Sequence, residues 1–287
     1  MAVSFEFFPP RSDEAHAQLR ATLARLAAHR PAFVSVTCGA GGSGADGATL
    51  DTLRAIRRDS ALAPAGHLTA AGRTRAEVDS AIAGYWSAGV RHIVALRGDM
   101  PEAGTPFTPH PWGYASALEL IEAARALAPF EISVAAYPEP HPESRSARAD
   151  LDVLARKAHA GATRALTQFC FATDAIVRLR DRIARAGIGL RIVPGIMLAT
   201  NFEATRRMAA RCGASVPGWL AARFDGTHDD PDTRRLLAAI VAASQVEELR
   251  REGFEDFHFY TLNRADVVGA VCRLLDERPQ TREELAA

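Results

Sequence analysis

The chain has 287 residues, 48% of them hydrophobic, and its 34 basic and 34 acidic residues give a formal net charge of zero. We therefore expect a substantial hydrophobic core and no electrostatic surface for nucleic acid or an acidic membrane, and no apolar run is long enough to span a bilayer. The sequence enters a strand almost at once, which argues against a signal peptide and for a cytoplasmic protein. Four widely spaced cysteines are expected to be buried thiols rather than disulfides or zinc ligands: Cys38, Cys170, Cys212 and Cys272.

Strand-like apolar runs alternate with segments of helical spacing from end to end. Strands are predicted at residues 3–8, 33–38, 66–70, 92–96, 131–137, 164–171, 191–197 and 256–262. Helices are predicted at residues 14–28, 48–58, 76–88, 115–127, 147–160, 174–186, 201–211, 231–252 and 265–275. Strand–helix units of this number and total length predict an α/β fold, a single (β/α)8 TIM barrel over residues 1–287. The alternative is a doubly wound sheet, but Pro9 and Pro10 stand where its GxGxxG turn usually follows the first strand.

The first predicted strand carries one carboxylate within an apolar run, VSFEFFPP, which two prolines end. Strand side chains alternate, so Ser4, Glu6 and Phe8 share one face. Because a carboxyl among aromatic side chains is costly to ionise, we expect the pKa of Glu6 to be raised, which would make it a candidate general acid. The alternative is a glutamate on the solvated face of an edge strand.

Polar side chains end most of the predicted strands, and in a barrel the chemistry gathers at these carboxyl ends. These side chains are expected to converge on one mouth: Glu6, Thr37, His67, Thr69, Arg97, Asp99, Tyr137, Gln168, Asn263 and Arg264. At the end of the fourth strand, Gly98 would let a ligand approach the backbone, and Asp99 would add negative charge. The alternative there is a plain turn in which Asp99 caps a helix.

The fifth strand is followed by a loop with three prolines that would fix Tyr137 and His141, and then by a helix with Asp150, Arg156 and Lys157. Lys157 is the single lysine of the chain. Basic residues near a barrel mouth can hold the phosphates of a cofactor, although a solvated helix face is the alternative.

Three further segments carry weaker signals. The amide of Gln168 can both donate to and accept from a heterocycle, or it can be a buried glutamine satisfied by backbone. The glycine-rich run 39–44 lacks the GK[ST] ending of a phosphate-binding loop and is expected to be a mobile loop at the mouth. The acidic segment 224–230 lacks a recognised ligand spacing, so we expect a turn and helix cap rather than a metal site.

Five long segments, in the same order, resemble the bacterial type of methylenetetrahydrofolate reductase, and the resemblance covers essentially the whole chain. The segments are 4–10, 92–101, 135–143, 160–169 and 257–265. The resemblance implies an FAD-containing barrel that reduces 5,10-methylenetetrahydrofolate to 5-methyltetrahydrofolate with electrons from NADH or NADPH. It also implies a homo-oligomer, no regulatory domain of the eukaryotic kind, and no control by S-adenosylmethionine.

The same resemblance implies roles for individual residues. Glu6 would be the general acid that protonates N10 of the folate, and Asp99 would stabilise the developing positive charge. FAD-contacting positions are matched by Thr37, His67, Arg97, Gly98, Asp99, Tyr114, Ala115, Tyr137, His141, Asp150, Arg156 and Lys157. Folate-contacting positions are matched by Gln168 and Arg264. Met208 stands where relatives often have a phenylalanine that stacks on the ligand, Ala204 replaces a folate-contacting glutamine, and Val153 replaces a polar residue in the cofactor helix.

Three other functions stay open from the sequence. A flavin-independent reductase would pass hydride directly from NADH or NADPH to a methylene-tetrahydropterin. A lyase with a Schiff-base lysine would need Lys157 inside the barrel, whereas the predicted helix carries it. A non-catalytic protein would bind folate or flavin without turnover.

Overall fold

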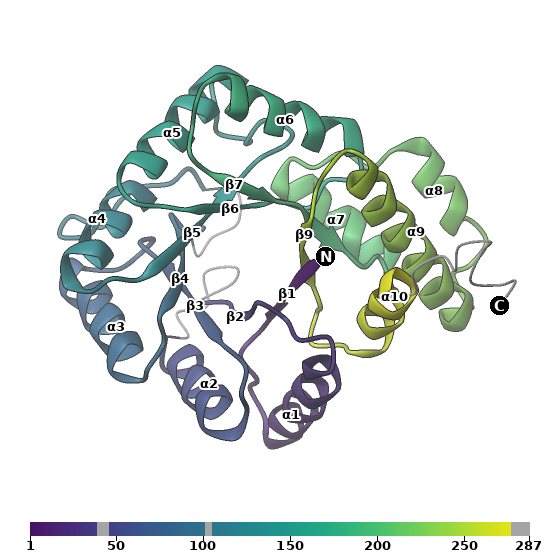
Figure 1. The fold of residues 1–287 in the computed structure, drawn as a ribbon, viewed down its shortest axis with the longest axis horizontal. Coiled ribbons are helices and arrows are strands. Elements are labelled where there is room, and N and C mark those ends of the chain that lie inside the picture. The colour runs from purple at the N-terminus through teal and green to yellow at the C-terminus, as the bar shows by residue number, and fades with distance from the viewer. Residues whose placement is uncertain (39–45, 101–104, 277–287) are drawn as a thin grey trace, which may run out of the picture.

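The strands form a nearly closed barrel, and the helices surround it (Figure 1). The computed structural model describes residues 1–38, 46–100 and 105–276. Its strands are β1 (Ala2–Phe7), β2 (Phe33–Val36), β3 (Pro64–Thr69), β4 (His92–Leu96), β5 (Glu131–Ala136), β6 (Arg164–Thr167), β7 (Arg191–Val193), β8 (Gly195–Met197) and β9 (Asp256–Tyr260). Its helices are α1 (Asp13–Ala27), α2 (Asp46–Asp59), α3 (Arg75–Ser87), α4 (Ala117–Leu127), α5 (Ala147–His159), α6 (Thr173–Arg185), α7 (Phe202–Cys212), α8 (Gly218–Phe224), α9 (Pro231–Arg251) and α10 (Asp266–Asp276).

The predicted seventh strand is split at Pro194 into β7 and β8. The two halves pair with the strands on opposite sides of the nearly closed barrel. All strand pairs are parallel; β7 pairs with β6, whereas β8 pairs with β9. Proline has no N–H to give to a ladder. Beyond it, the N–H of Gly195 donates to the hydroxyl of Thr167 at 2.8 Å, and the hydroxyl of Tyr260 donates to the Thr167 carbonyl at 2.7 Å. The two halves count as one strand unit, so the (β/α)8 barrel is confirmed.

Side-chain caps explain why most predicted helix boundaries are correct to within two residues. Thr74 and Glu77 form a reciprocal capping box at the start of α3. Helix α4 begins at Ala117 rather than at the predicted residue 115, because the hydroxyl of Ser116 accepts from the N–H of Glu119 and caps the first turn. Helix α8 was not predicted, since it is short and has no side-chain cap.

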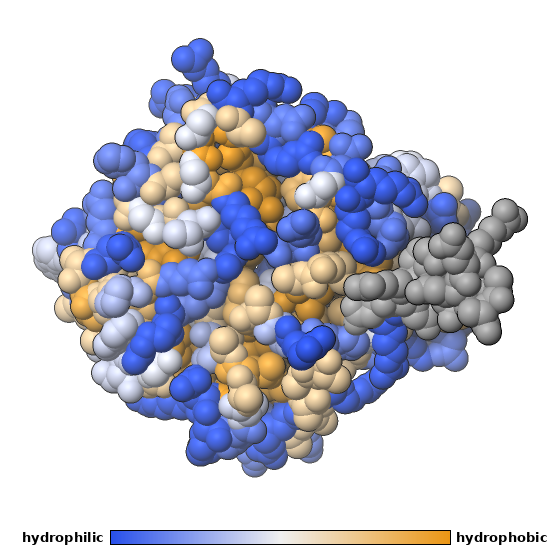
Figure 2. Space-filling view, viewed as in Figure 1, coloured by the Kyte–Doolittle hydropathy of each residue, from blue (hydrophilic) through white to orange (hydrophobic). Residues whose placement is uncertain are grey.

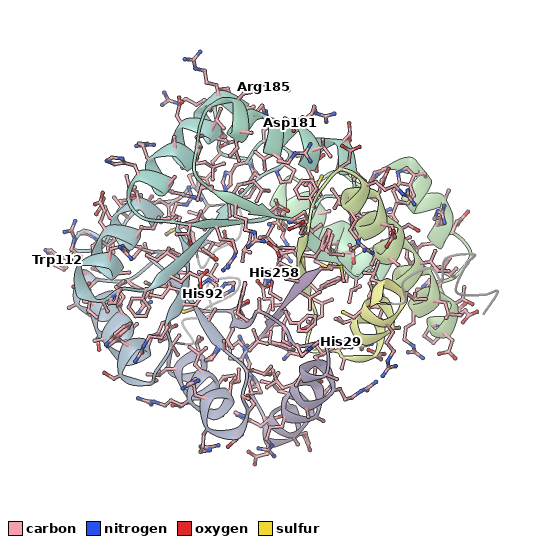
Figure 3. All side chains as sticks on the ribbon, viewed as in Figure 1. His29, His92, Trp112, Asp181, Arg185 and His258 are labelled. Atoms are coloured by element: carbon pink, nitrogen blue, oxygen red, sulfur yellow. The ribbon has the colours of Figure 1, made fainter. Side chains whose placement is uncertain are left out.

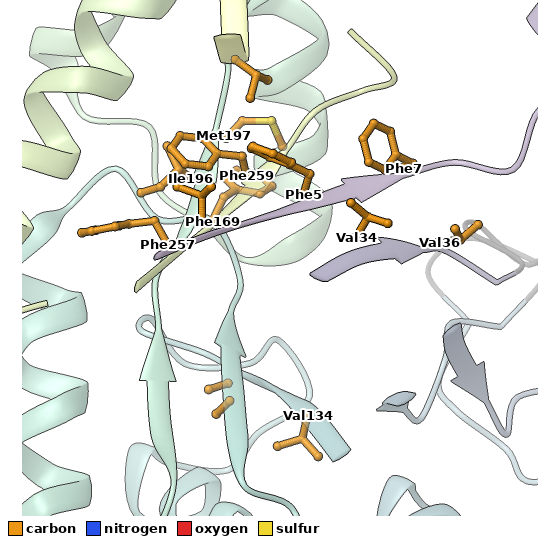
Figure 4. Close-up of a cluster of buried hydrophobic side chains, with 14 of the residues drawn as sticks. Phe5, Phe7, Val34, Val36, Val134, Phe169, Ile196, Met197, Phe257 and Phe259 are labelled. Carbon is orange, nitrogen blue, oxygen red and sulfur yellow. The ribbon is translucent and has the colours of Figure 1, made fainter. Parts of the chain in front are cut away.

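The strands separate an outer apolar face from an inner face that carries both apolar and polar side chains. The outward side chains Phe5, Phe257 and Phe259 are fully buried beneath the helices (Figure 4). Each such phenylalanine contributes about 1.5–3 kcal/mol by leaving water. Inward side chains form a second, smaller apolar cluster, made of Phe33, Ala65, Val94, Leu166 and Val193. The helices are therefore held to the sheet by aromatic packing, while the inner face combines this small apolar cluster with buried polar side chains such as Ser4, His67 and His258.

The outer surface is mostly polar around its periphery, and apolar side chains appear toward the middle of the face shown in Figure 2. In the described part of the chain, no helix is both long and apolar enough to cross a membrane. No disulfide joins any of the four cysteines; Cys38, Cys170 and Cys272 are buried as predicted, whereas Cys212 is only half-buried. The predicted glycine-rich loop at 39–44 lies outside the described residues.

Candidate active site

Glu6 lies on the inner face of β1, between two histidines from other strands. Its Oε2 is 3.4 Å from Nε2 of His67 on β3 and 3.5 Å from Nε2 of His258 on β9. The Glu6 side chain is 15% exposed, and that of His258 is fully buried. Figure 3 shows His258 near the middle of the ring of strands. The carboxyl of Glu6 is thus shielded from bulk water and faces two imidazoles.

The prediction that the pKa of Glu6 is raised is wrong. Burial does raise it, but the polar contact from His258 and the charges of His67 and His258 outweigh burial and hold the pKa of Glu6 below its usual value. The aromatic neighbours of Glu6 in the sequence, Phe5 and Phe7, point to the opposite face of β1. Glu6 therefore faces two imidazoles and lies beside Tyr260, and not beside Phe5 and Phe7.

The two histidines differ in their other contacts. Burial lowers the pKa of His67, and the charge of Glu6 only partly opposes this, so His67 is neutral near pH 7. His258 places Nδ1 2.7 Å from Oγ of Ser4, the residue two before Glu6. Both Nε2 atoms are buried and make no hydrogen bond of ordinary geometry within the described chain. Sequence reasoning missed His258, although the alternation of FHFYT puts it on the same face as Tyr260.

The turn after β4 brings charge to the mouth of the barrel. Gly98 has φ of 84°, and a Cβ there would lie 2.9 Å from Cβ of Thr69, so only glycine fits. Arg97 makes a two-pronged ion pair with Glu143, with distances of 2.8 and 2.7 Å. Helix α4 is capped by Ser116, so the alternative in which Asp99 caps that helix is wrong.

The proline-rich loop after β5 joins this charged region. The ring of His141 meets that of Tyr137 edge to face at 4.6 Å, and the His141 N–H donates to Asp150 at 3.3 Å. Burial, followed by the charge of Asp99, raises the pKa of Tyr137 to about 12. Burial lowers the pKa of Lys157 to about 8, and the charge of Asp150 opposes this. We call this group the mouth cluster; its members are Arg97, Asp99, Tyr137, His141, Asp150 and Lys157.

Three residues predicted to end strands at the mouth, Thr37, Gln168 and Asn263, differ in their hydrogen bonds. Thr37 has a buried hydroxyl oxygen without a hydrogen-bond partner among the described residues. The side-chain oxygen of Gln168 accepts from the N–H of Phe169 at 2.9 Å, which leaves the amide nitrogen as its donor. The side chain of Asn263 bonds both the N–H and the carbonyl of Phe8, at 2.8 and 3.0 Å. The side chain of Asn263, just beyond the carboxyl end of β9, is thus occupied by the backbone at the end of β1.

Other predicted site residues are not joined to the mouth cluster by any contact seen in the described ranges. The hydroxyl of Tyr114 donates to Asp79 at 2.7 Å, and burial raises the pKa of Tyr114 to about 12. Arg264 is exposed and lines an open groove with Gln18 and Arg25 of α1. The remaining three are on helices or just before one: Ala115 and Arg156, both exposed, and Met208, which packs half-buried against the core.

The acidic segment before α9 behaves as predicted. Asp230 caps this helix by accepting from the N–H of Thr233 at 2.9 Å. Within residues 1–38, 46–100 and 105–276, no three histidine, cysteine or acidic side chains are grouped so as to hold a metal ion.

Comparison with known proteins identifies the family. The sequence model described as methylenetetrahydrofolate reductase matches residues 1–276. The chain is 46% identical over 277 residues to 5,10-methylenetetrahydrofolate reductase from Escherichia coli K12, covering 96% of this chain and 91% of that protein. It is 37% identical over 272 residues to the protein of the same name from Buchnera aphidicola of Acyrthosiphon pisum, covering 95% and 91%. It is 33% identical to methylenetetrahydrofolate reductase (NADH) 1 from Zea mays, covering 91% of this chain but 46% of the maize protein.

Solved structures agree on the fold alone. A Clostridium thermocellum protein described as binding two copies of 5-methyl-5,6,7,8-tetrahydrofolic acid has a TM-score of 0.63 at 11% identity, covering 95% of this chain and 93% of that one. An aldo-keto reductase from Klebsiella pneumoniae, solved with NADPH, has a TM-score of 0.53 at 14% identity, covering 99% and 88%. Because the family model spans nearly the whole chain and the bacterial relatives match it over almost their full length, the chain belongs to the methylenetetrahydrofolate reductase family.

Proposed function

We propose that the protein reduces 5,10-methylenetetrahydrofolate to 5-methyltetrahydrofolate, that FAD carries the hydride from NADH or NADPH, and that Glu6 is the general acid. Membership of the family supplies the reaction. The observation that carries the role of Glu6 is its shielded carboxyl, whose Oε2 faces two imidazole Nε2 atoms at 3.4 and 3.5 Å. Assembly of identical copies and a cytoplasmic location belong to the same proposal.

The acid has one task in this reaction. The methylene bridge opens when N10 of the folate receives a proton as its bond to the bridging carbon breaks, which leaves an iminium cation. Glu6 would give that proton, so the Oε2–H bond breaks and an N10–H bond forms. Asp99, which is exposed at the mouth, would stabilise the cation through its negative charge. With Glu6 only 15% exposed, competing proton transfer from bulk water is limited.

The side chains near the mouth of the barrel carry the chemical groups that would bind a flavin dinucleotide. The buried hydroxyl of Thr37 lacks a partner in the described chain and is free to bind one. Arg97 and Lys157 can hold phosphate oxygens, and Tyr137 and His141 offer aromatic edges. FAD, when bound, would supply the hydride transfer that no side chain can perform. The residues proposed to hold it are Thr37, His67, Arg97, Gly98, Asp99, Tyr114, Ala115, Tyr137, His141, Asp150, Arg156 and Lys157.

The folate would use a smaller set of side chains. The amide nitrogen of Gln168 can donate to the pterin, because the oxygen of the same side chain is occupied by the N–H of Phe169. Met208 can pack against an aromatic ring through its thioether. The exposed guanidinium of Arg264 suits a carboxylate of the folate tail.

Replacing Glu6 tests the proposal. Glu6→Gln keeps the size of the side chain but removes the acidic proton, so oxidation of the reduced protein by methylenetetrahydrofolate should slow by about 10²–10⁴-fold. Reduction of the bound flavin by NADH should continue at the wild-type rate. Stopped-flow absorbance measures the two steps separately, and Glu255→Gln, on the exposed surface, is the matched control. An unchanged folate step in Glu6→Gln would show that Glu6 is not the acid.

A further inference from the structure

Ser4 and His258 form a buried polar pair behind Glu6. The register of β1 and β9 sets Ser4 beside His258 and Glu6 beside Tyr260. The Oγ of Ser4 is 2.7 Å from Nδ1 of His258 and 3.4 Å from the carbonyl of Phe257. Ser4 is 2% exposed and His258 is fully buried, so neither side chain exchanges its partners readily with water.

The Ser4 hydroxyl has one proton. Its contacts with the Phe257 carbonyl and with His258 determine which nitrogen of the imidazole carries a hydrogen. The Phe257 carbonyl can only accept, so the Ser4 hydroxyl can donate to it when Nδ1 of His258 carries a hydrogen and donates to Oγ. In that tautomer the opposite ring nitrogen, Nε2, is the site that can bind a further proton. Nε2 is buried, lacks an ordinary hydrogen bond in the described chain, and faces Oε2 of Glu6 at 3.5 Å.

Packing holds the imidazole in this orientation. The ring of Phe33 stacks on that of His258 at 5.7 Å with an interplanar angle of 20°. The ring of Tyr260 meets it edge to face at 5.5 Å. With one face and one edge covered by aromatic rings and Nδ1 tied to Ser4, rotation of the ring would break a hydrogen bond and disturb packed neighbours.

We propose that Ser4 and His258 are positioning residues for the acid: they keep Nε2 of His258 against Glu6, so that a single proton is shared between Nε2 and Oε2 and is delivered to the substrate from Oε2. The proposal rests on the proposed function for the identity of the proton acceptor. At delivery the Nε2–H bond breaks as Oε2–H forms, and Oε2–H breaks as N10–H forms. The positive charge moves from the imidazole to the folate, and water later restores the proton.

We assign the shared proton to His258 rather than to the other ionisable side chains around Glu6. His67, on β3, also faces Glu6, but burial lowers its pKa and keeps it neutral. Tyr260, beside Glu6, has its pKa raised far above the usual value by burial and by the charge of Glu6. Beyond the Phe33 ring lies His92, whose pKa burial lowers to about 3. A carboxyl held below its usual pKa can still act as an acid near neutral pH if His258 stores the proton.

His258→Gln gives the first test. The amide of glutamine can bond Glu6 but cannot take up a proton, so the folate step should slow by about 10- to 100-fold near neutral pH. The rate should recover as the pH is lowered, because Glu6 must then hold the proton alone. A role in structure only would slow the step equally at every pH and leave the profile unshifted, which would contradict the proposal. His16→Gln, on the exposed part of α1, is the matched control.

Ser4→Ala and Ser4→Thr complete the set. Alanine removes the anchor of Nδ1 and should slow the folate step with the same dependence on pH, but less than His258→Gln, whereas threonine restores a hydroxyl and should recover most of the rate. Equal loss in both variants would show that packing, and not the hydroxyl, matters at this position.

Nitrogen NMR of histidine-labelled protein tests the shared proton without turnover. The proposal predicts that Nδ1 of His258 carries a hydrogen and that the Nε2 signal moves in Glu6→Gln, because the carboxylate that shares its proton is gone. His258→Gln identifies the signals. Identical Nδ1 and Nε2 signals of His258 in wild type and Glu6→Gln would overturn the proposal, whether or not the protein reduces folate.

Discussion

Two ionisable side chains near the barrel mouth have pKa values shifted by different causes. For Glu6, contacts with two imidazoles outweigh burial and lower the pKa of the carboxyl. For Lys157, burial dominates and lowers the pKa to about 8, so its ammonium begins to lose its proton just above neutral pH. Its Nζ donates to the carbonyl of Ala135 at 3.4 Å, which fixes the position of the charge within the mouth cluster.

The lowered pKa of Lys157 leads us to expect that the affinity for the cofactor depends on pH. If its ammonium holds a phosphate of FAD, affinity is full below pH 8 and falls as the pH rises through that value, by about tenfold for each unit above it. Lys157→Arg keeps the charge at all these pH values and should flatten the dependence. Fluorescence titration of the protein with FAD between pH 7 and 9 measures this. An equal fall in wild type and Lys157→Arg would assign the dependence to another group.

At the scale of single residues, alternation along the strand correctly predicts that Glu6 and Ser4 face away from Phe5. What surrounds Glu6 could not be predicted, because its partners are set by strand order: His258 lies 254 residues from Ser4 in the sequence, yet the two strands are adjacent. The prediction for the pKa of Glu6 fails for that reason.

At the scale of elements, the turn after β9 holds the end of β1. The Asn263 side chain bonds the N–H and carbonyl of Phe8 at 2.8 and 3.0 Å, and the Thr261 hydroxyl donates to the Glu6 carbonyl at 2.5 Å. Thr22 of α1 donates to the Asn263 carbonyl at 3.3 Å. These bonds link the last strand, the first strand and the first helix around the acid.

Replacing Asn263 should therefore lower the free energy of unfolding. Two variants separate the contribution of its side-chain hydrogen bonds from that of its backbone conformation. Its φ of 59° is left-handed, a conformation that glycine adopts without strain. Asn263→Gly removes only the side-chain bonds and should lower the free energy of unfolding by about 1–3 kcal/mol. Asn263→Ala should lose a further 1 kcal/mol or so from strain. Urea unfolding measures both, and equal stability of Asn263→Gly and wild type would show that these side-chain bonds contribute nothing.

Local chemistry explains which elements could be predicted. Capping residues such as Thr74 and Ser116 mark where helices begin, and apolar runs predict the positions of the strands. The split at Pro194 was not predicted, because a proline inside an apolar run can end a strand or merely interrupt it. Helix α8 is too short to show a periodic pattern.

At the scale of the whole molecule, the two ends of the barrel have different roles. Ion pairs join neighbouring strands at their N-terminal ends: Arg164 lies 2.7 Å from Glu131, and Arg191 pairs with Asp256. Glu6 and the mouth cluster lie at the carboxyl ends. Polar groups at the first end therefore hold strands together, while those at the other end are available to ligands, as is general for this fold.

We propose that this member of the methylenetetrahydrofolate reductase family depends on a bound flavin to reduce folate. The most direct test is the visible absorption spectrum of the purified protein, repeated anaerobically after addition of 5-methyltetrahydrofolate. We expect a flavin spectrum that bleaches when the folate is added, since the reaction then runs in reverse and reduces the flavin. A protein that stays colourless after incubation with FAD, or a bound flavin that methyltetrahydrofolate does not bleach, would contradict it.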